Sequence, residues 1–135
     1  MRCMAQPEAR ARIRQLREED ALQLEATSTD GVTVVRMQAR ELAFAVCEEF
    51  QKGMEKLMES GNTMLLIDFE TIEFMDSMGI GTLIALRNKA HERGGELGLA
   101  RIADPVHKVL RITQLHKVFP IYDDLESGVQ ALRNR

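Results

Sequence analysis

The sequence has few aromatic residues and nothing that could cross a membrane. Its 135 residues include no Trp, one Tyr and five Phe, so a hydrophobic core has to be built from Leu, Ile, Val, Met and Ala. No apolar run approaches the ~20 residues of a membrane-spanning helix. The first twenty residues lack the apolar stretch of a secretory signal. These absences favour a cytoplasmic protein that does not interact with membranes.

Cysteine and histidine are also scarce. Cys3 and Cys47 lie far apart and form no Cys-x-x-Cys pair, and His91, His107 and His116 are scattered. This spacing fits no metal site, and no Ser/His/Asp or Cys/His arrangement can be located. We therefore expect two free thiols in a reducing compartment, no metal, no cofactor, no catalytic residues and no enzymatic activity.

Charge divides the chain into two parts. The net charge of −3 at pH 7 argues against a nucleic-acid partner. Residues 1–20 hold five arginines followed by Glu18, Glu19 and Asp20, with few apolar residues. We interpret 1–20 as a solvated, Arg-rich extension without a core of its own, with a partner-binding or nucleic-acid-binding arm as the alternative. Residues 21–135 then form one domain, a usual size.

The domain is expected to open with a β-hairpin. Leu22 to Thr27 alternates apolar and polar residues, as in a half-buried strand. Asp30-Gly31 is the strongest short signal for a two-residue hairpin turn. Val32 to Met37 is rich in β-branched residues and predicts the second strand.

Two long helices are predicted, over Phe44–Ser60 and Ser77–Arg93, because apolar residues recur there at helical spacing. Glycines follow each one and favour its end. The faces expected to point inward carry Cys47, Phe50, Met54 and Leu57 in the first helix and Ile80, Leu83, Ile84 and Leu86 in the second.

The remaining elements alternate in the same way. An apolar run over Met64–Phe69 predicts a central strand covered on both faces. Asp68 interrupts it; we expect a buried carboxylate that accepts backbone hydrogen bonds, with positioning of the next turn as the alternative. The other expected elements are a strand at Leu97–Ile102, a helix with Asp104 as N-cap and Pro105 at its first position, a strand at Val118–Tyr122, and a last helix capped by Asp123 or Asp124.

The order ββαβαβαβα predicts an α/β fold. Strands that alternate with helices call for parallel pairing with right-handed crossovers. We expect an N-terminal β-hairpin that leads into a mostly parallel mixed sheet of four to five strands, with helices packed on it.

The turn before the second long helix is the candidate site, because α/β domains place functional residues at the carboxyl ends of their strands. Gly79 and Gly81 fall in the helix's first turn, where glycine is destabilising but lets another backbone come close. Phosphate on Ser77 would lie at a helix N-terminus, which favours anions. It would add about −1.5 to −2 charges beside Asp76 and Glu73, and that charge could expel an apolar or acidic partner. Alternatively, Asp76 or Ser77 only caps the helix, and the glycines only allow tight packing.

The residues Phe74-Met75-Asp76-Ser77-Met78-Gly79-Ile80-Gly81 resemble the signature turn of STAS domains, D-S-[ST]-G-hydrophobic-G. The similarity extends from about Leu22 to Leu132. Further matching stretches are Gly94-Gly95-Glu96-Leu97, Asp104-Pro105-Val106, Leu115 to Phe119, Tyr122-Asp123 and Leu125.

The resemblance implies an anti-sigma factor antagonist that is switched by phosphorylation. In such proteins the serine after the aspartate, here Ser77, is the phosphorylation site. The implied partners are an anti-sigma factor serine/threonine kinase, which is bound to release a sigma factor, and a PP2C-type phosphatase; a homodimer is left open. The implied partner-binding residues are Asp76, Ser77, Met78, Gly79, Ile80 and Gly81.

Two features depart from the family pattern. Met78 replaces the second Ser or Thr of the signature, and Arg40-Glu41-Leu42-Ala43 stands where many members carry Gly-x-Leu-Asp. A second interpretation therefore stays open, a STAS interaction or scaffold module in a signalling or other complex that is not phosphorylated. A third, a small-molecule-binding or enzymatic α/β domain, predicts a deep pocket with polar groups at the strand ends.

Overall fold

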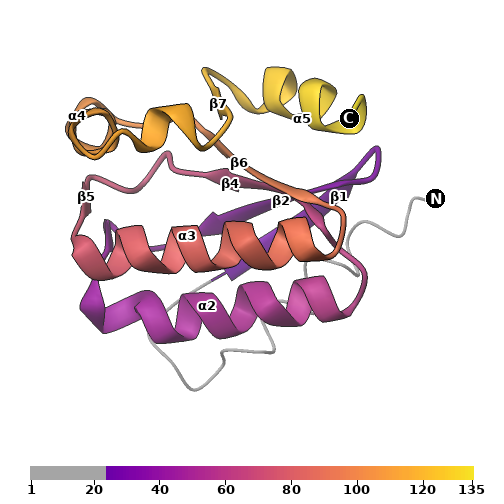
Figure 1. The fold of residues 1–135 in the computed structure, drawn as a ribbon, viewed down its shortest axis with the longest axis horizontal. Coiled ribbons are helices and arrows are strands. Elements are labelled where there is room, and N and C mark those ends of the chain that lie inside the picture. Colours follow the sequence, from indigo (N-terminus) through magenta and orange to yellow (C-terminus); the bar gives the residue numbers. More distant parts are fainter. Residues whose placement is uncertain (1–23) are drawn as a thin grey trace.

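The computed structural model describes residues 24–135, drawn in colour in Figure 1. The proposed extension 1–20 and the first two residues of the predicted first strand lie outside this part. The elements in chain order are β1 (Leu24–Thr29), β2 (Val32–Met37), β3 (Glu41–Leu42), α2 (Phe44–Glu59), β4 (Met64–Asp68), β5 (Phe74–Met75), α3 (Ser77–Glu92), β6 (Glu96–Ala100), α4 (Asp104–Ile112), the 3₁₀ turn η1 (Leu115–Lys117), β7 (Ile121–Tyr122) and α5 (Leu125–Arg133).

The main sheet has five strands in the order β1-β2-β4-β6-β7. β1 is antiparallel to β2, and the other pairs are parallel. The predicted hairpin turn is confirmed: Asp30 and Gly31 have φ of 54° and 83°, as a type I′ turn requires. The fold is thus the expected α/β sheet with an N-terminal hairpin.

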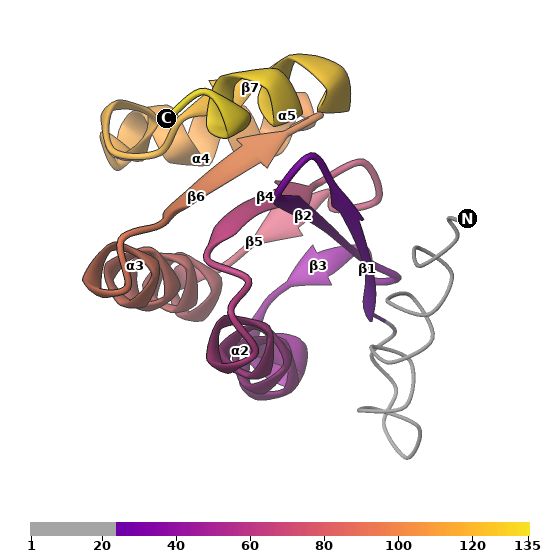
Figure 2. The same ribbon diagram turned by 90° about the vertical axis from the view of Figure 1, so that its right-hand side faces the viewer.

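Helices cover both faces of this sheet (Figures 1 and 2). α2 and α3 lie side by side on one face, and α5 lies on the other. The larger core cluster lies on the first face and includes the predicted inward residues of α2. The smaller cluster beneath α5 consists of Val32, Leu66, Ala100, Val129 and Leu132, with partly buried neighbours.

Four boundary predictions were wrong, and one of them is the strand expected at Leu97–Ile102, which is β6 at Glu96–Ala100. β1 continues to Thr29, opposite Val32, because a two-residue turn leaves no room for a longer loop. Asp104 is not the N-cap of α4, because Ala103 has that position. Asp104 lies in the first turn, where its negative charge interacts favourably with the helix dipole. The last strand begins at Ile121, because the backbone before it forms η1 and its flanking turns.

The burial prediction for α3 was wrong at one residue. Leu83 and Leu86 are fully buried, and Ile80 packs against the core, but Ile84 is 36% exposed. α3 carries apolar residues on its outward side as well as its inward side, so periodicity alone could not separate the two faces. Of the two alternatives for α5, Asp124 is the cap, and its side chain accepts from the Ser127 N–H at 2.7 Å.

Candidate functional site

Ser77 is the first residue of α3 and is exposed. The chain reaches it from the carboxyl end of β4 through a loop and the short strand β5. The same edge of the molecule holds the amino end of α2, at the left of Figure 1. The predicted position of Ser77, at a helix N-terminus beside the strand ends, therefore agrees with the structure.

Asp76 caps α3 and also binds α2. Its Oδ1 accepts a hydrogen bond from the Gly79 N–H at 2.9 Å, and its Oδ2 accepts one from the Phe44 N–H at 3.1 Å. Ala43, the N-cap residue of α2, makes no side-chain cap bond. One carboxylate therefore satisfies backbone donors at the start of two helices. Of the two capping candidates, Asp76 has this role, and its side chain is occupied within the chain.

The stretch that departs from the family pattern lies directly beside this turn. Glu41 and Leu42 form β3, which pairs in parallel with Phe74 and Met75 of β5. A Cβ added at Gly79 would overlap the backbone carbonyl oxygen of Leu42. Gly79 is therefore required for close packing of α3 against β3, and this two-strand sheet, which the sequence did not predict, fixes the turn.

The six predicted partner-binding residues divide into two groups. Asp76, Gly79 and Ile80 are buried or half-buried and hold the turn in place. The exposed members are Ser77, Met78 and Gly81, and the Met78 side chain is 48% exposed. Only the second group is available to a partner.

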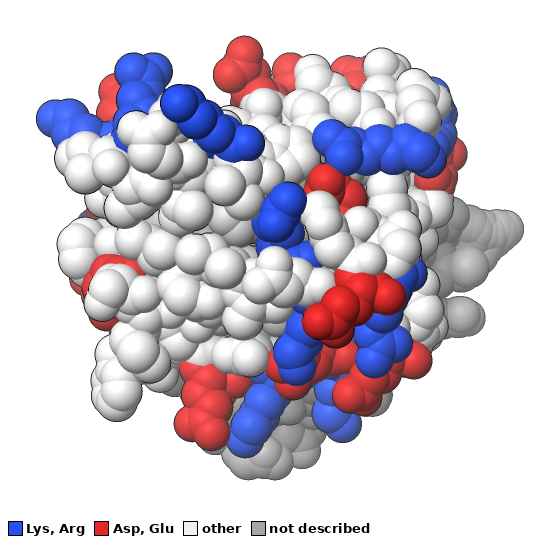
Figure 3. Space-filling view, in the orientation of Figure 1, with Lys and Arg blue, Asp and Glu red and all other residues white. Residues whose placement is uncertain are grey.

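Two exposed aromatic residues join this surface and were missed by the sequence reasoning. Phe44 is 74% exposed, and Phe74 is 49% exposed. Phe44 precedes Cys47 and Phe50 at helical spacing, so periodicity gives it an inward position. The start of α2 reaches the edge of the core, and only the structure shows that this ring is in solvent. In Figure 3 few charges lie over the amino-terminal halves of α2 and α3.

Asp68 behaves as a satisfied buried carboxylate. It is 1% exposed and accepts hydrogen bonds from the Glu70 N–H at 3.0 Å and from Arg101 at 2.7 and 3.1 Å. The hydrogen bond to Asp68 raises the pKa of the Arg101 guanidinium. Arg101 has a positive φ of 59°, a strained conformation for such a residue. The prediction that Asp68 accepts a backbone hydrogen bond is confirmed. Its pairing with Arg101 was not predicted.

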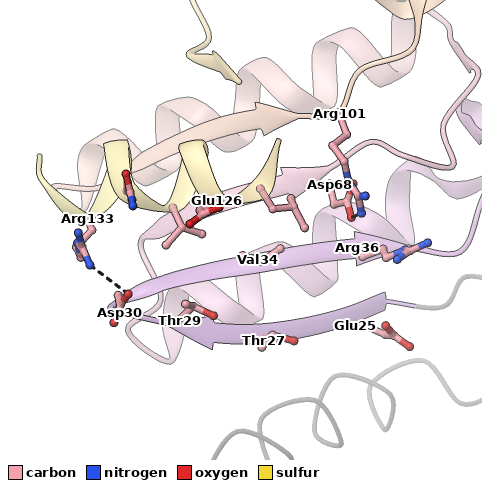
Figure 4. A pocket seen from close by; sticks show the side chains of 13 residues that line it. Glu25, Thr27, Thr29, Asp30, Val34, Arg36, Asp68, Arg101, Glu126 and Arg133 are labelled. Carbon is pink, nitrogen blue, oxygen red and sulfur yellow. Dashed lines mark hydrogen bonds and ion pairs between the residues drawn. The ribbon is translucent and has the colours of Figure 1, made fainter. Parts of the chain in front are cut away.

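A groove of about 590 Å³ lies on the other face of the sheet, between α5 and the β1–β2 hairpin (Figure 4). Two ion pairs lie among its lining side chains: Arg133 binds Asp30 at 3.2 Å, and Arg101 binds Asp68 at 2.7 Å. Ser77 and its neighbours do not line this groove. Its lining includes Asp68 and Arg101 at the carboxyl ends of β4 and β6, which is the polar lining at the strand ends that the small-molecule alternative predicts.

Residues 24–135 hold neither a candidate metal site nor a candidate membrane-spanning helix. No group of three or more His, Cys, Asp or Glu side chains in this part could hold a metal ion. None of its helices combines the length and apolarity needed to span a membrane. Cys47 is buried, and burial raises the pKa of its thiol.

Comparison with known proteins gives one consistent family. The sequence pattern of the STAS domain matches residues 23–128. The anti-sigma F factor antagonist of Paenibacillus polymyxa is 28% identical over 104 residues, which is 76% of this chain and 88% of that protein.

Solved structures share the fold. An anti-sigma factor antagonist from Mycobacterium paratuberculosis superposes with a TM-score of 0.74 at 24% identity, covering 85% of this chain and 97% of that one. The Bacillus cell fate determinant SpoIIAA in its phosphorylated form gives a TM-score of 0.63 at 24% identity, covering 85% and 100%.

Proposed function

This chain belongs to the STAS domain family, and from that membership we propose that it is an anti-sigma factor antagonist whose binding is switched off by phosphorylation of Ser77. Its partner would be an anti-sigma factor that is also a serine kinase. Binding of the unphosphorylated chain would release the sigma factor, and a PP2C-type phosphatase would restore it after phosphorylation. The names of the relatives support the antagonist assignment.

The observation that carries this proposal is the exposed residue Ser77 beside exposed apolar side chains. Ser77 is an exposed residue at the start of α3, so a kinase could reach its Oγ. Phe74 and Met78 on either side are both about half exposed. An apolar surface of this kind is typical of a protein-binding site.

Phosphorylation would change this surface in one step. The kinase would transfer the γ-phosphoryl group of ATP to Ser77 Oγ, with loss of the hydroxyl proton and release of ADP. The product carries about −1.5 to −2 charges and three acceptor oxygens. The amino end of α3 favours such an anion, so the modified chain would stay folded. A partner that covers the site would have to desolvate this charge, which is unfavourable without matching cations.

The test uses the purified serine-kinase anti-sigma factor from the same organism. We expect the wild-type chain to bind it without hydrolysable ATP and, when ATP is added, to acquire one phosphate on Ser77, located by peptide mass spectrometry. Ser77→Asp should lose binding at least tenfold, whereas Ser77→Ala should bind but acquire no phosphate there. Ser127→Ala on α5 is the matched control and should behave as wild type.

The same experiment distinguishes the phosphorylation switch from the alternative of a scaffold module that is not phosphorylated. The departures at Met78 and Ala43 favour it, because they alter the surface beside Ser77. In that case the serine has no switching role, and Ser77→Ala and Ser77→Asp would bind a partner equally well. Equal binding of the two variants, or phosphate at other residues only, would reject the phosphorylation switch.

A further inference from the structure

The outward side of α3 differs from that of an ordinary surface helix. From Ser77 to Leu86 the helix contains no charged residue. Its exposed side chains in this stretch include Met78 and Ile84, with Gly81 between them. A helix that remains in water normally has charged or polar residues on its solvent side. The pattern indicates that another surface covers this part of α3.

Gly81 supports the same conclusion independently. Glycine inside a helix is less stable than alanine, so its presence calls for a reason. Gly79 has one within the chain, the carbonyl group of Leu42. A Cβ added at Gly81 would meet nothing within 4 Å in the described structure. The space above Gly81 is open, and a residue without a side chain there lets the backbone of another molecule come close.

Charges border this surface on the side of α4 and η1. Lys108, Arg111 and Lys117 are exposed there, and Asp104 is the acidic residue of α4. In Figure 3 basic side chains gather above the uncharged area, near the position of α4 in Figure 1. A partner that is apolar at its centre and acidic along this border would complement the surface.

We propose that the α3 face, defined by Phe44, Met78, Gly81 and Ile84, receives an amphipathic helix of the anti-sigma factor, which crosses α3 at Gly81. This inference rests on the antagonist function proposed above and adds where and how the partner binds. The apolar side of the partner helix packs on the α3 face, and acidic residues on one edge lie near Lys108 and Arg111. Ser77 lies at the amino end of this contact. A phosphate on Ser77 would have to be buried beneath the docked helix, and this opposes binding of the phosphorylated chain.

The test measures binding of the unphosphorylated chain to the same purified anti-sigma factor by calorimetry. Gly81→Leu should weaken binding at least tenfold because the side chain fills the space needed by the partner backbone. Its unfolding midpoint should be no lower than that of wild type, because leucine favours a helix and the site is open. Ile84→Glu should also weaken binding at least tenfold.

Two further variants test the charge border and the specificity of the effect. Reversing the charges at Lys108 and Arg111 to Glu should weaken binding threefold or more and reduce its dependence on salt. Gln130→Glu adds a negative charge on the exposed side of α5, across the sheet, and should stay within twofold of wild type.

The outcomes separate the two proposals. If the wild-type chain neither binds the anti-sigma factor nor is phosphorylated on Ser77, both are wrong. If it binds and Ser77→Asp abolishes binding, but Gly81→Leu and Ile84→Glu bind as wild type, only the docking proposal is wrong. Sedimentation provides a third result: a wild-type dimer that Gly81→Leu converts to a monomer would assign the α3 face to a second copy of this chain and overturn the proposed occupant.

Discussion

The carboxylate of Asp76 accepts a hydrogen bond from the backbone N–H of Phe44 at 3.1 Å, which joins the residue before the exposed serine to the first residue of the neighbouring helix. The same carboxylate caps α3 through Gly79. Because Ala43 has no side-chain acceptor to offer, α2 depends on α3 for this bond. The positions of Phe44 and Ser77 on the surface are therefore coupled through one side chain.

Asp76→Ala should destabilise the domain by about 2 kcal/mol, because two backbone donors at helix starts lose their acceptor and each such cap contributes about 1 kcal/mol. Asp76→Asn keeps one side-chain oxygen and should lose about half as much. Chemical denaturation of both variants beside wild type measures this difference. Equal stability of the alanine variant and wild type would mean that water replaces the carboxylate in full.

The two glycines of the signature should respond oppositely to alanine. Gly79→Ala places a methyl group against the backbone carbonyl of Leu42 and against Met75, so we expect a loss of about 2 kcal/mol or more. Gly81→Ala is the matched control on the same helix; with open space at its Cβ position it should gain roughly 0.5–1 kcal/mol. Thermal unfolding of the two variants measures the difference. A loss of stability in Gly79→Ala alone shows that close packing at residue 79 requires glycine, whereas equal losses in both variants would contradict this explanation.

Local patterns were sufficient to predict most of the fold. The Asp30-Gly31 turn predicted the hairpin, and the alternation of strand and helix patterns predicted the parallel sheet and its two long helices. Both signals are local, because turn chemistry and periodicity are properties of neighbouring residues. Asp68 was expected to be buried and satisfied, and it is. The Arg101 that binds it lies 33 positions away, and nothing in the sequence near either residue indicates the pair.

Long-range pairing explains what sequence reasoning missed at the site. The two-residue strands β3 and β5 are too short to give an alternating pattern, so the sheet that holds the turn could not be predicted. The exposure of Ile84 and Phe44 depends on which side of a helix meets the core and where the core ends. Periodicity identifies apolar positions but does not show that a surface is left uncovered.

Breaking the pair of Asp68 and Arg101 should be costly. Arg101→Met removes both arginine hydrogen bonds and leaves the carboxylate, 1% exposed, with the Glu70 N–H as its remaining partner in the described structure. An uncompensated buried charge costs about 3 kcal/mol or more. Adding Asp68→Asn to this variant should recover part of the loss, because the amide is neutral. A double-mutant cycle by denaturation measures the coupling, and strictly additive losses would contradict it.

Glu96 connects the end of α3 to the carboxyl end of the chain. It is 7% exposed, its Oε1 lies 2.6 Å from Nε2 of His91, and its Oε2 lies 2.7 Å from Arg135. The Leu97 N–H also donates to Oε1 at 3.0 Å. Burial alone would raise the pKa of Glu96, but the hydrogen bonds from His91 and Leu97 and the charge of Arg135 hold this pKa below its ordinary value of 4.5.

The lowered pKa of Glu96 predicts a specific dependence of stability on pH. A carboxylate whose pKa is lower in the folded state stabilises the fold above the unfolded pKa, and this contribution is lost as the pH falls through the folded value. Glu96→Gln should therefore be less stable than wild type above about pH 5, and the difference in free energy of unfolding should shrink as the pH falls below 4.5. Urea denaturation from pH 7 to 3 measures it, with exposed Glu92→Gln as the matched control. A difference that stays constant over this range would show that the ionisation of Glu96 makes no contribution to stability.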